Sequence, residues 1–121
     1  MNTKGLGTQG EELAARFLEK CGYKILERNF KVKWGELDII AQEQDTICFV
    51  EVKMRRSLQF GLPQESVEAR KRQKLIRIAQ GYLKMKFNTD ERKSRFDVVA
   101  IHQEKNGEPS VCLFKNAFDK V

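Results

Sequence analysis

The stretch Gly35-Glu36-Leu37-Asp38-Ile39-Ile40-Ala41 and the following run Thr46-Ile47-Cys48-Phe49-Val50-Glu51-Val52-Lys53 decide the fold of this chain. Both runs are rich in β-branched and aliphatic residues, and the break between them, Glu43-Gln44-Asp45, is polar. They therefore predict an antiparallel hairpin. Four charged residues interrupt the two runs, where strands that serve only a core would carry none.

The turn sets the register of this hairpin. A two-residue turn at Gln44-Asp45 gives facing residues whose numbers sum to 89. This register places Asp38 opposite Glu51, and Glu36 opposite Lys53. Because side chains alternate along a strand, all four would point to one face. Facing Cβ atoms lie about 4.5–5.5 Å apart, where like charges repel. Glu36 and Lys53 would form an ion pair, whereas Asp38 and Glu51 require a cation between them.

The facing carboxylates predict a metal site. Asp38 and Glu51 offer oxygen ligands to a hard cation, and the backbone carbonyl of Val52 would supply a third ligand. Mg²⁺ or Mn²⁺ is expected, since Mg²⁺ keeps several waters and binds through few carboxylates plus substrate phosphate. Lys53 would lie on the same face and could activate a water or stabilise charge on a phosphate. These groups predict metal-assisted hydrolysis of a phosphodiester.

The length, the hydropathy and the cysteine content of the chain limit the class of protein it can be. Its 121 residues predict a single domain, 1-121, that buries a core of its own. No apolar run is long enough to span a membrane, and the first residues lack the apolar core of a secretory signal. Cys21, Cys48 and Cys112 are interpreted as small buried hydrophobes in a reducing compartment, not as disulfides or a zinc site. We therefore expect a cytoplasmic protein.

The other elements follow from hydrophobic periodicity. It predicts helices over 8–21 and 64–87, the second with a break near 66–68, and strands over 23–31, 95–101 and 111–114. The helix that crosses between the third and fourth strands predicts an α/β fold, α-β-β-β-α-β(-β), with a central mixed sheet flanked by helices. Asp97, inside the apolar strand 95–101, is interpreted as a hydrogen-bonded structural residue.

Glu11 has two interpretations. With Thr8 it fits a capping box at the start of the first helix. It also precedes Ala14, Ala15 and Leu18 by three, four and seven residues, so it borders the buried stripe as an inward-facing functional acid. The residues alone leave these two roles balanced.

The second helix is basic outside its apolar stripe. From Arg70 through Lys86 no acid occurs, whereas a solvated face usually mixes both signs. With a net charge of +6, this favours a surface that binds nucleic-acid phosphates over one that serves only solubility. The residues expected to contact nucleic acid are Arg55, Arg56, Arg70, Lys71, Arg72, Lys74 and Arg77.

Two patterns carry a resemblance to known nucleases. Asp38, followed thirteen positions later by Glu51-Val52-Lys53, resembles the D…(D/E)xK signature of restriction-endonuclease-like nucleases. A wider pattern resembles the YraN-like family of small bacterial predicted endonucleases, which are similar to archaeal Holliday-junction resolvases. It comprises Gly10-Glu11, Gly22-Tyr23, Ile25-Leu26, Arg28-Asn29, Gly35 to Ala41, Phe49 to Lys53 with Arg55, Phe60-Gly61, Arg95 to Val99 and Asn116-Ala117-Phe118.

The resemblance implies a role for each matching residue. Asp38 and Glu51 would be metal ligands, Lys53 the catalytic lysine, and Glu11 the helix acid of the metal site. Glu36 would lie at the edge of the site. Leu37 departs from the nuclease signature, which often has Pro before the Asp, but that position takes no part in the chemistry.

The resemblance also implies an activity and partners. The chain is expected to be a Mg²⁺- or Mn²⁺-dependent endonuclease with a restriction-endonuclease-like fold, acting on DNA, including branched or structured DNA. By analogy with resolvases, a homodimer is expected. The alternative is a non-catalytic nucleic-acid-binding module of the same fold, whose binding would weaken steeply with salt and be indifferent to metal.

Overall fold

The computed structural model describes residues 3–55, 69–89, 91–103 and 107–118. Its elements are α1 (Thr3–Lys20), β1 (Lys24–Val32), β2 (Gly35–Glu43), β3 (Thr46–Arg55), α2 (Ala69–Phe87), β4 (Ser94–His102) and β5 (Ser110–Phe118). This order is the predicted α-β-β-β-α-β-β.

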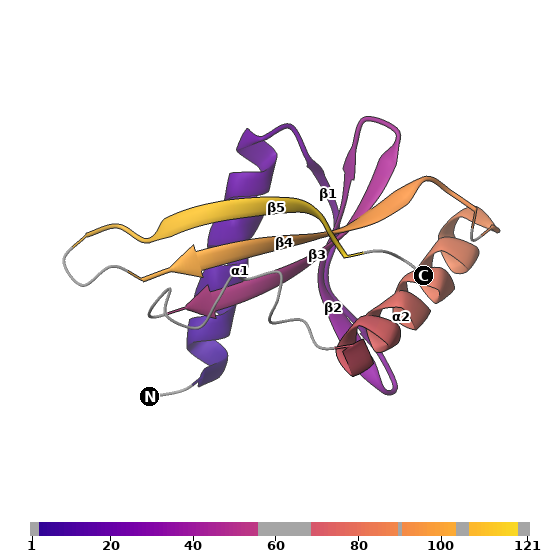
Figure 1. The fold of residues 1–121 in the computed structure, drawn as a ribbon, viewed down its shortest axis with the longest axis horizontal. Helices are drawn as coiled ribbons and strands as arrows, with labels where there is room; N and C mark the ends of the chain where they lie inside the picture. The colour runs from indigo at the N-terminus through magenta and orange to yellow at the C-terminus, as the bar shows by residue number, and fades with distance from the viewer. Residues whose placement is uncertain (1–2, 56–68, 90, 104–106, 119–121) are drawn as a thin grey trace.

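The strands form one mixed sheet in the order β1-β2-β3-β4-β5 (Figure 1). Only β3 and β4 run parallel, and α2 is the connection between them; the other neighbouring strands are antiparallel. A parallel pair needs such a crossover because a tight turn cannot join its ends. The predicted mixed α/β architecture is therefore confirmed.

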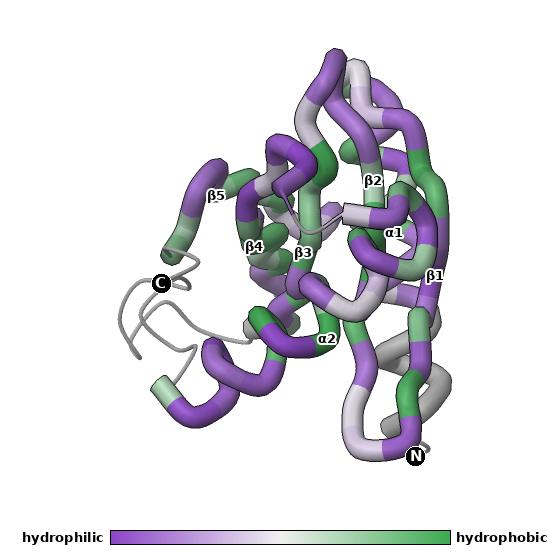
Figure 2. Tube along the Cα trace, turned by 90° about the vertical axis from the view of Figure 1, so that its right-hand side faces the viewer, coloured by the Kyte–Doolittle hydropathy of each residue, from purple (hydrophilic) through white to green (hydrophobic). Residues whose placement is uncertain are grey.

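A hydrophobic core lies on each face of the sheet. Beneath α1 the buried residues are Ala14, Ala15, Leu18, Tyr23, Ile39, Ala41, Cys48, Val50, Val99 and Ile101. Beneath α2 they include Leu37, Ile40, Phe49, Leu75, Ile78, Tyr82, Phe96 and Val98. Apolar residues follow one another along β3 and β4, as expected for strands covered on both sides (Figure 2). Among the described helices, none is long and apolar enough to cross a membrane.

The end of α1 is fixed by a Schellman turn. The N–H of Tyr23 donates to the carbonyl of Leu18 at 2.9 Å, and the N–H of Gly22 donates to that of Glu19 at 3.1 Å. Gly22 has a φ of 94°, a left-handed conformation that glycine adopts without a Cβ clash. This turn directs Tyr23 into the core under α1.

Asp97 is the centre of a buried hydrogen-bond network, as the sequence predicted. Its carboxylate, 0% exposed, accepts from the hydroxyl of Tyr23 at 2.8 Å and from the backbone N–H of Asn116 at 2.9 Å. Arg95 donates to Asp97 at 3.0 Å and, through its other nitrogen, to Glu43 at 2.7 Å. The network ties the turn after α1 to β2, β4 and β5, and it satisfies both oxygens of the buried Asp97 carboxylate.

Several predicted boundaries and environments need correction. The first helix begins at Thr3, so Thr8 lies inside it and the capping-box interpretation is wrong. Two glycines near the start, Gly5 and Gly7, weaken the helical pattern there and hide the true beginning. The last strand extends to Phe118 rather than ending at 114. The predicted helical residues 64–68 lie outside the described residues.

The prediction that all three cysteines are buried is wrong. All three are free, but only Cys48 is buried, whereas Cys21 and Cys112 are exposed. Cys21 follows the last residue of α1 at the Schellman turn. Cys112 lies on β5, an edge strand whose side chains alternate between exposed and half-buried.

Candidate active site

The central feature of the site is a fork between β2 and β3. The two strands pair in the predicted register from Glu43↔Thr46 to Ile39↔Val50. Beyond that pair the two strands part, although β1 still pairs with β2 and β4 still pairs with β3 (Figure 1). The N–H of Val52 donates to Asp38 Oδ2 at 2.9 Å, which replaces the missing ladder contact with a side chain.

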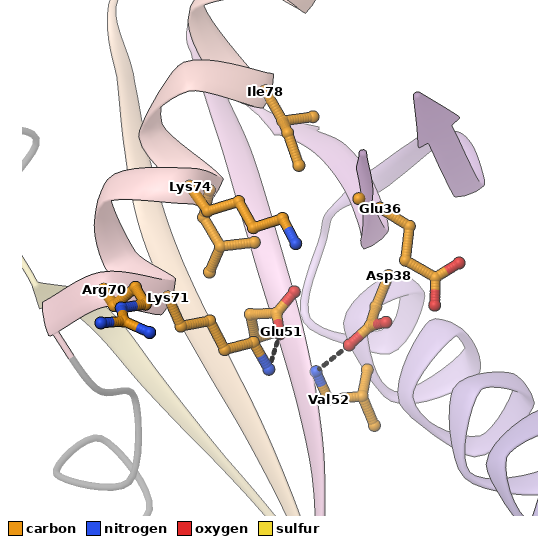
Figure 3. Close-up of a pocket in the computed structure, with 10 residues that line it drawn as sticks. Glu36, Asp38, Glu51, Val52, Arg70, Lys71, Lys74 and Ile78 are labelled. Atoms are coloured by element: carbon orange, nitrogen blue, oxygen red, sulfur yellow. Dashed lines mark hydrogen bonds and ion pairs between the residues drawn. The ribbon is translucent and has the colours of Figure 1, made fainter. Parts of the chain in front are cut away.

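A cavity of about 600 Å³ lies between this fork and α2 (Figure 3). Its floor is acidic and its rim is basic, because the fork supplies carboxylates and the first turns of α2 supply cations. The lining residues are Gly35, Glu36, Asp38, Glu51, Val52, Arg70, Lys71, Lys74, Leu75 and Ile78. Six residues predicted to serve catalysis, metal or nucleic-acid binding therefore meet in one place, together with Glu36, which was predicted at the edge of the site.

Glu51 is the most constrained acid of the site. Its side chain is only 5% exposed, and its Oε2 lies 3.1 Å from the ammonium of Lys71. Its Oε1 is buried and has no hydrogen-bond partner in the described part of the chain. A buried carboxylate oxygen without a partner costs free energy, about 1–3 kcal/mol or more for a charged group. Such a group indicates a site that a cation or a donor completes.

Asp38 is electrostatically crowded. Burial, followed by the negative charge of Glu51, raises the pKa of Asp38 to about 7. The charge of Glu11 raises this pKa further, while the Val52 N–H and the Lys71 ammonium oppose the rise. Glu11 therefore lies close enough to act on Asp38 from α1, which supports the inward-facing interpretation of this residue.

Lys53 lies near the acids without lining the cavity. Burial and the neighbouring Lys71 ammonium lower the pKa of Lys53 to about 8, although Glu51 and Asp38 favour its charged form. The predicted ion pair between Glu36 and Lys53 is wrong: no such contact exists among the described residues. The reason is the fork, which carries the two positions apart as β3 follows β4.

Lys71 has a more specific place than the sequence predicted. We expected a general phosphate contact, but its side chain reaches from α2 across the cavity to Glu51 (Figure 3). Lys71 precedes the buried Leu75, Ile78 and Tyr82 by four, seven and eleven residues, so it continues the apolar stripe of α2. The same helical spacing placed Glu11 beside the buried stripe of the first helix. Applied to the second helix, it would have indicated that Lys71 points toward the sheet.

The other predicted nucleic-acid contacts divide into two groups. Arg70 and Lys74 line the cavity, whereas Arg72 and Arg77 are exposed on α2 away from its lining. The side chain of Arg55 and the whole of Arg56 lie outside the described residues.

The acids fit an open site for a hard cation better than a closed one. No three His, Cys, Asp or Glu side chains of the described residues are gathered closely enough to form a metal centre by themselves. Mg²⁺ needs only one or two carboxylates, because waters and substrate phosphate complete its shell. Asp38 and the free oxygen of Glu51 provide that donor set.

Comparison with known proteins gives a family but no activity. The model of an uncharacterised protein family, UPF0102, matches residues 10–101. A UPF0102 protein of Caldicellulosiruptor saccharolyticus is 49% identical over 98% of this chain and 100% of its own length. One from Acetivibrio thermocellus is 46% identical over 97% of this chain and 93% of its own. A solved structure of Pyrococcus furiosus SfsA in complex with Ca²⁺ aligns at 18% identity and a TM-score of 0.44, over 94% of this chain and 64% of that one.

Proposed function

The chain belongs to the uncharacterised protein family UPF0102, and we propose that it is a metal-dependent endonuclease that hydrolyses phosphodiester bonds of DNA. The observation that carries the proposal is the buried carboxylate of Glu51, whose Oε1 has no partner in the described residues. It shares a cavity with Asp38, whose pKa is raised to about 7 by burial and by the charge of Glu51. Perturbed acids in a cleft are typical of functional sites.

Each group at the fork has a role in this proposal. Asp38, Glu51 and the carbonyl of Val52 would hold Mg²⁺ or Mn²⁺, with Glu11 contributing from α1. The ion, when bound, would polarise a phosphoryl oxygen and lower the pKa of a water. The N–H of Val52 keeps the Asp38 carboxylate oriented, through the 2.9 Å hydrogen bond.

Lys53 would act as the general base that accepts a proton from the attacking water. Burial and the adjacent Lys71 lower its pKa to about 8, so a useful fraction of its Nζ is neutral near physiological pH. A neutral amine accepts a proton most efficiently when its pKa is close to the working pH. After protonation, the ammonium would stabilise the charge that develops on the phosphate.

The basic rim supports a nucleic-acid substrate. Arg70 and Lys74 border the same cavity as the acids, on a helix that lacks acidic residues, and the chain carries a net charge of +6. Cations at this rim would hold the phosphates on either side of the scissile bond. We propose branched or structured DNA as the substrate, a homodimer as the form that cuts its two strands, and the cytoplasm as the compartment.

A cleavage panel tests the proposal. Purified protein is incubated with labelled four-way junction, flap, single-stranded and duplex DNA, with Mg²⁺ or Mn²⁺ and with a chelator. We expect cleavage that the chelator stops and that Asp38→Ala abolishes. Asp45→Ala is the matched control, because Asp45 belongs to the same hairpin but lies in its exposed turn. The proposal fails if no substrate is cut with metal, or if Asp38→Ala cuts as well as the wild type.

The same panel separates the alternative function. A non-catalytic binding module would shift labelled DNA in a mobility assay with equal affinity in metal and in chelator, and would cut nothing. The observation that favours this alternative is the Lys71–Glu51 ion pair, which partly neutralises the acids without a metal. Replacing Lys71, Arg72 and Lys74 with Glu would then abolish binding.

A further inference from the structure

Lys71 occupies the place of a cation in this site. We infer that its ammonium is a resident counter-ion of Glu51 that competes with a divalent metal for the charge of this carboxylate, so that Lys71 sets the metal affinity of the site. This inference rests on the proposed function. It concerns a residue that the nuclease signature does not contain, contributed by α2 rather than by the hairpin.

The geometry makes the ion pair easy to exchange. Glu51 is held on β3, between β4 and the fork, and its side chain is 5% exposed, so the acid has little freedom to move. Lys71 lies on α2, and its side chain is 45% exposed. A flexible four-carbon stem of this kind withdraws into solvent at low cost. The Glu51 carboxylate keeps its position when the Lys71 ammonium withdraws and can then bind a divalent cation.

The position of Lys71 on its helix supports a role at the site. Lys71 precedes the buried Leu75 and Ile78 by four and seven residues, so it lies on the face of α2 that packs on the sheet. On that face its ammonium contacts the buried carboxylate of Glu51 at 3.1 Å.

Repulsion among the acids explains why a counter-ion is needed at this site. Without a cation, Asp38 and Glu51 repel each other at the fork, and Glu11 adds a third negative charge. The ammonium relieves this repulsion while leaving Glu51 Oε1 without a partner. A divalent ion would offer more charge and satisfy that oxygen, so the two cations compete for one carboxylate.

Metal titration by calorimetry tests the inference without DNA or turnover. Mn²⁺ is titrated into metal-free wild type, Lys71→Met and Lys74→Met at a fixed pH above 7, where Asp38 is ionised. Lys74 is the matched control because it lines the same cavity but makes no ion pair among the described residues. We expect Lys71→Met to bind Mn²⁺ roughly three- to tenfold tighter, and Lys74→Met to change affinity by less than about twofold.

A second variant, Lys71→Arg, should change the Mn²⁺ affinity in the opposite direction. Lys71→Arg keeps the charge and offers a planar fork that holds a carboxylate more firmly, so it should weaken Mn²⁺ binding. Thermal melting adds an independent measurement: metal-free Lys71→Met should melt below the wild type, and saturating Mn²⁺ should raise its Tm more. A residue that only supports the fold would lower stability in both states without tightening metal binding.

The outcomes separate this inference from the proposed function. If the wild type binds Mn²⁺ and Asp38→Ala does not, the metal site stands. Equal or weaker binding by Lys71→Met then overturns the counter-ion role alone. If the wild type binds no Mn²⁺, or Asp38→Ala binds it equally well, the proposed function and this inference both fall.

Discussion

The carboxylate of Asp38 accepts a 2.9 Å hydrogen bond from the backbone N–H of Val52, directly beyond the last paired residues of β2 and β3. At this point the N–H of β3 donates to a side-chain carboxylate instead of to a backbone carbonyl of β2. The contact places an acid at the opening of the fork, where the two strands separate. It also fixes one oxygen of Asp38, so that the other can serve a ligand.

The raised pKa of Asp38 predicts how stability depends on pH. Burial and the charge of Glu51 raise its pKa from 3.8 to about 7, so the folded state binds its proton more tightly than the unfolded state. The metal-free protein should therefore lose stability as pH rises from about 4 to about 7. Asp38→Asn should remove most of this loss and stabilise the protein at pH 8 by about 1–2 kcal/mol.

Urea unfolding at a series of pH values checks this expectation. Asp45→Asn is the control, since that exposed acid has its pKa lowered, chiefly by the charge of Lys93, and so contributes the opposite slope. A wild type whose stability is constant or increases between pH 4 and 7, with Asp38→Asn following the same curve, contradicts the burial of an ionised Asp38.

Glu11 and Glu12 are neighbours on α1 with different expected roles. The charge of Glu11 acts on Asp38, whereas Glu12 pairs with Arg16 at 3.1 Å and with Arg28 at 2.8 Å on the surface. Glu11→Gln should weaken Mn²⁺ binding and metal-dependent cleavage by about tenfold or more, with little change in Tm. Glu12→Gln should leave both unchanged, because its ion pairs with Arg16 and Arg28 are exposed to solvent. The same loss of metal binding in both variants would remove Glu11 from the site.

Two buried tyrosines distinguish a hydroxyl that supports the fold from one that does not. Tyr23 donates to the buried carboxylate of Asp97 at 2.8 Å, whereas the hydroxyl of Tyr82 is buried without a partner in the described residues. Tyr23→Phe should cost about 1–2 kcal/mol of unfolding free energy, and Tyr82→Phe should be neutral or stabilising. Denaturant unfolding measures both. Equal costs would refute the network as a support of the sheet.

The basic rim predicts the salt dependence of DNA binding. Lys74 lines the cavity, whereas Lys86 lies in the last turn of the same helix. Lys74→Gln should reduce the slope of log affinity against log salt by about 1, and Lys86→Gln should leave it unchanged. The single tryptophan, Trp34, is adjacent to the cavity residue Gly35 and reports binding by fluorescence in the presence of a chelator. Equal slopes for the two variants would show that Lys74 does not contact DNA phosphates and would contradict DNA binding at this rim.

Local sequence specified much of the hairpin and of the first helix. The turn at Gln44-Asp45 set the register, because each strand alternates with a fixed period of two. Helical spacing put Glu11 beside the buried stripe of α1, and its charge acts on Asp38. The failure of the capping box at Thr8 shows the limit of such signals, since the same Thr-x-x-Glu pattern occurs here inside a helix that already includes Thr3.

The fork and the position of Lys71 depended on contacts between distant segments. From sequence alone, the hairpin register extended to Glu36 and Lys53, and nothing in those residues indicated where pairing would stop. Pairing of β2 with β3 ends at Ile39↔Val50, while β1 holds β2 and β4 holds β3 on both sides of that point. The sequence by itself determined the register as far as Ile39 and Val50, whereas the predicted pairing of Asp38 with Glu51 lies beyond the last paired residues. Only the tertiary structure decided that the strands open there and that Lys71 of α2 contacts Glu51, because those outcomes depend on sheet pairing and helix docking between segments far apart in the chain.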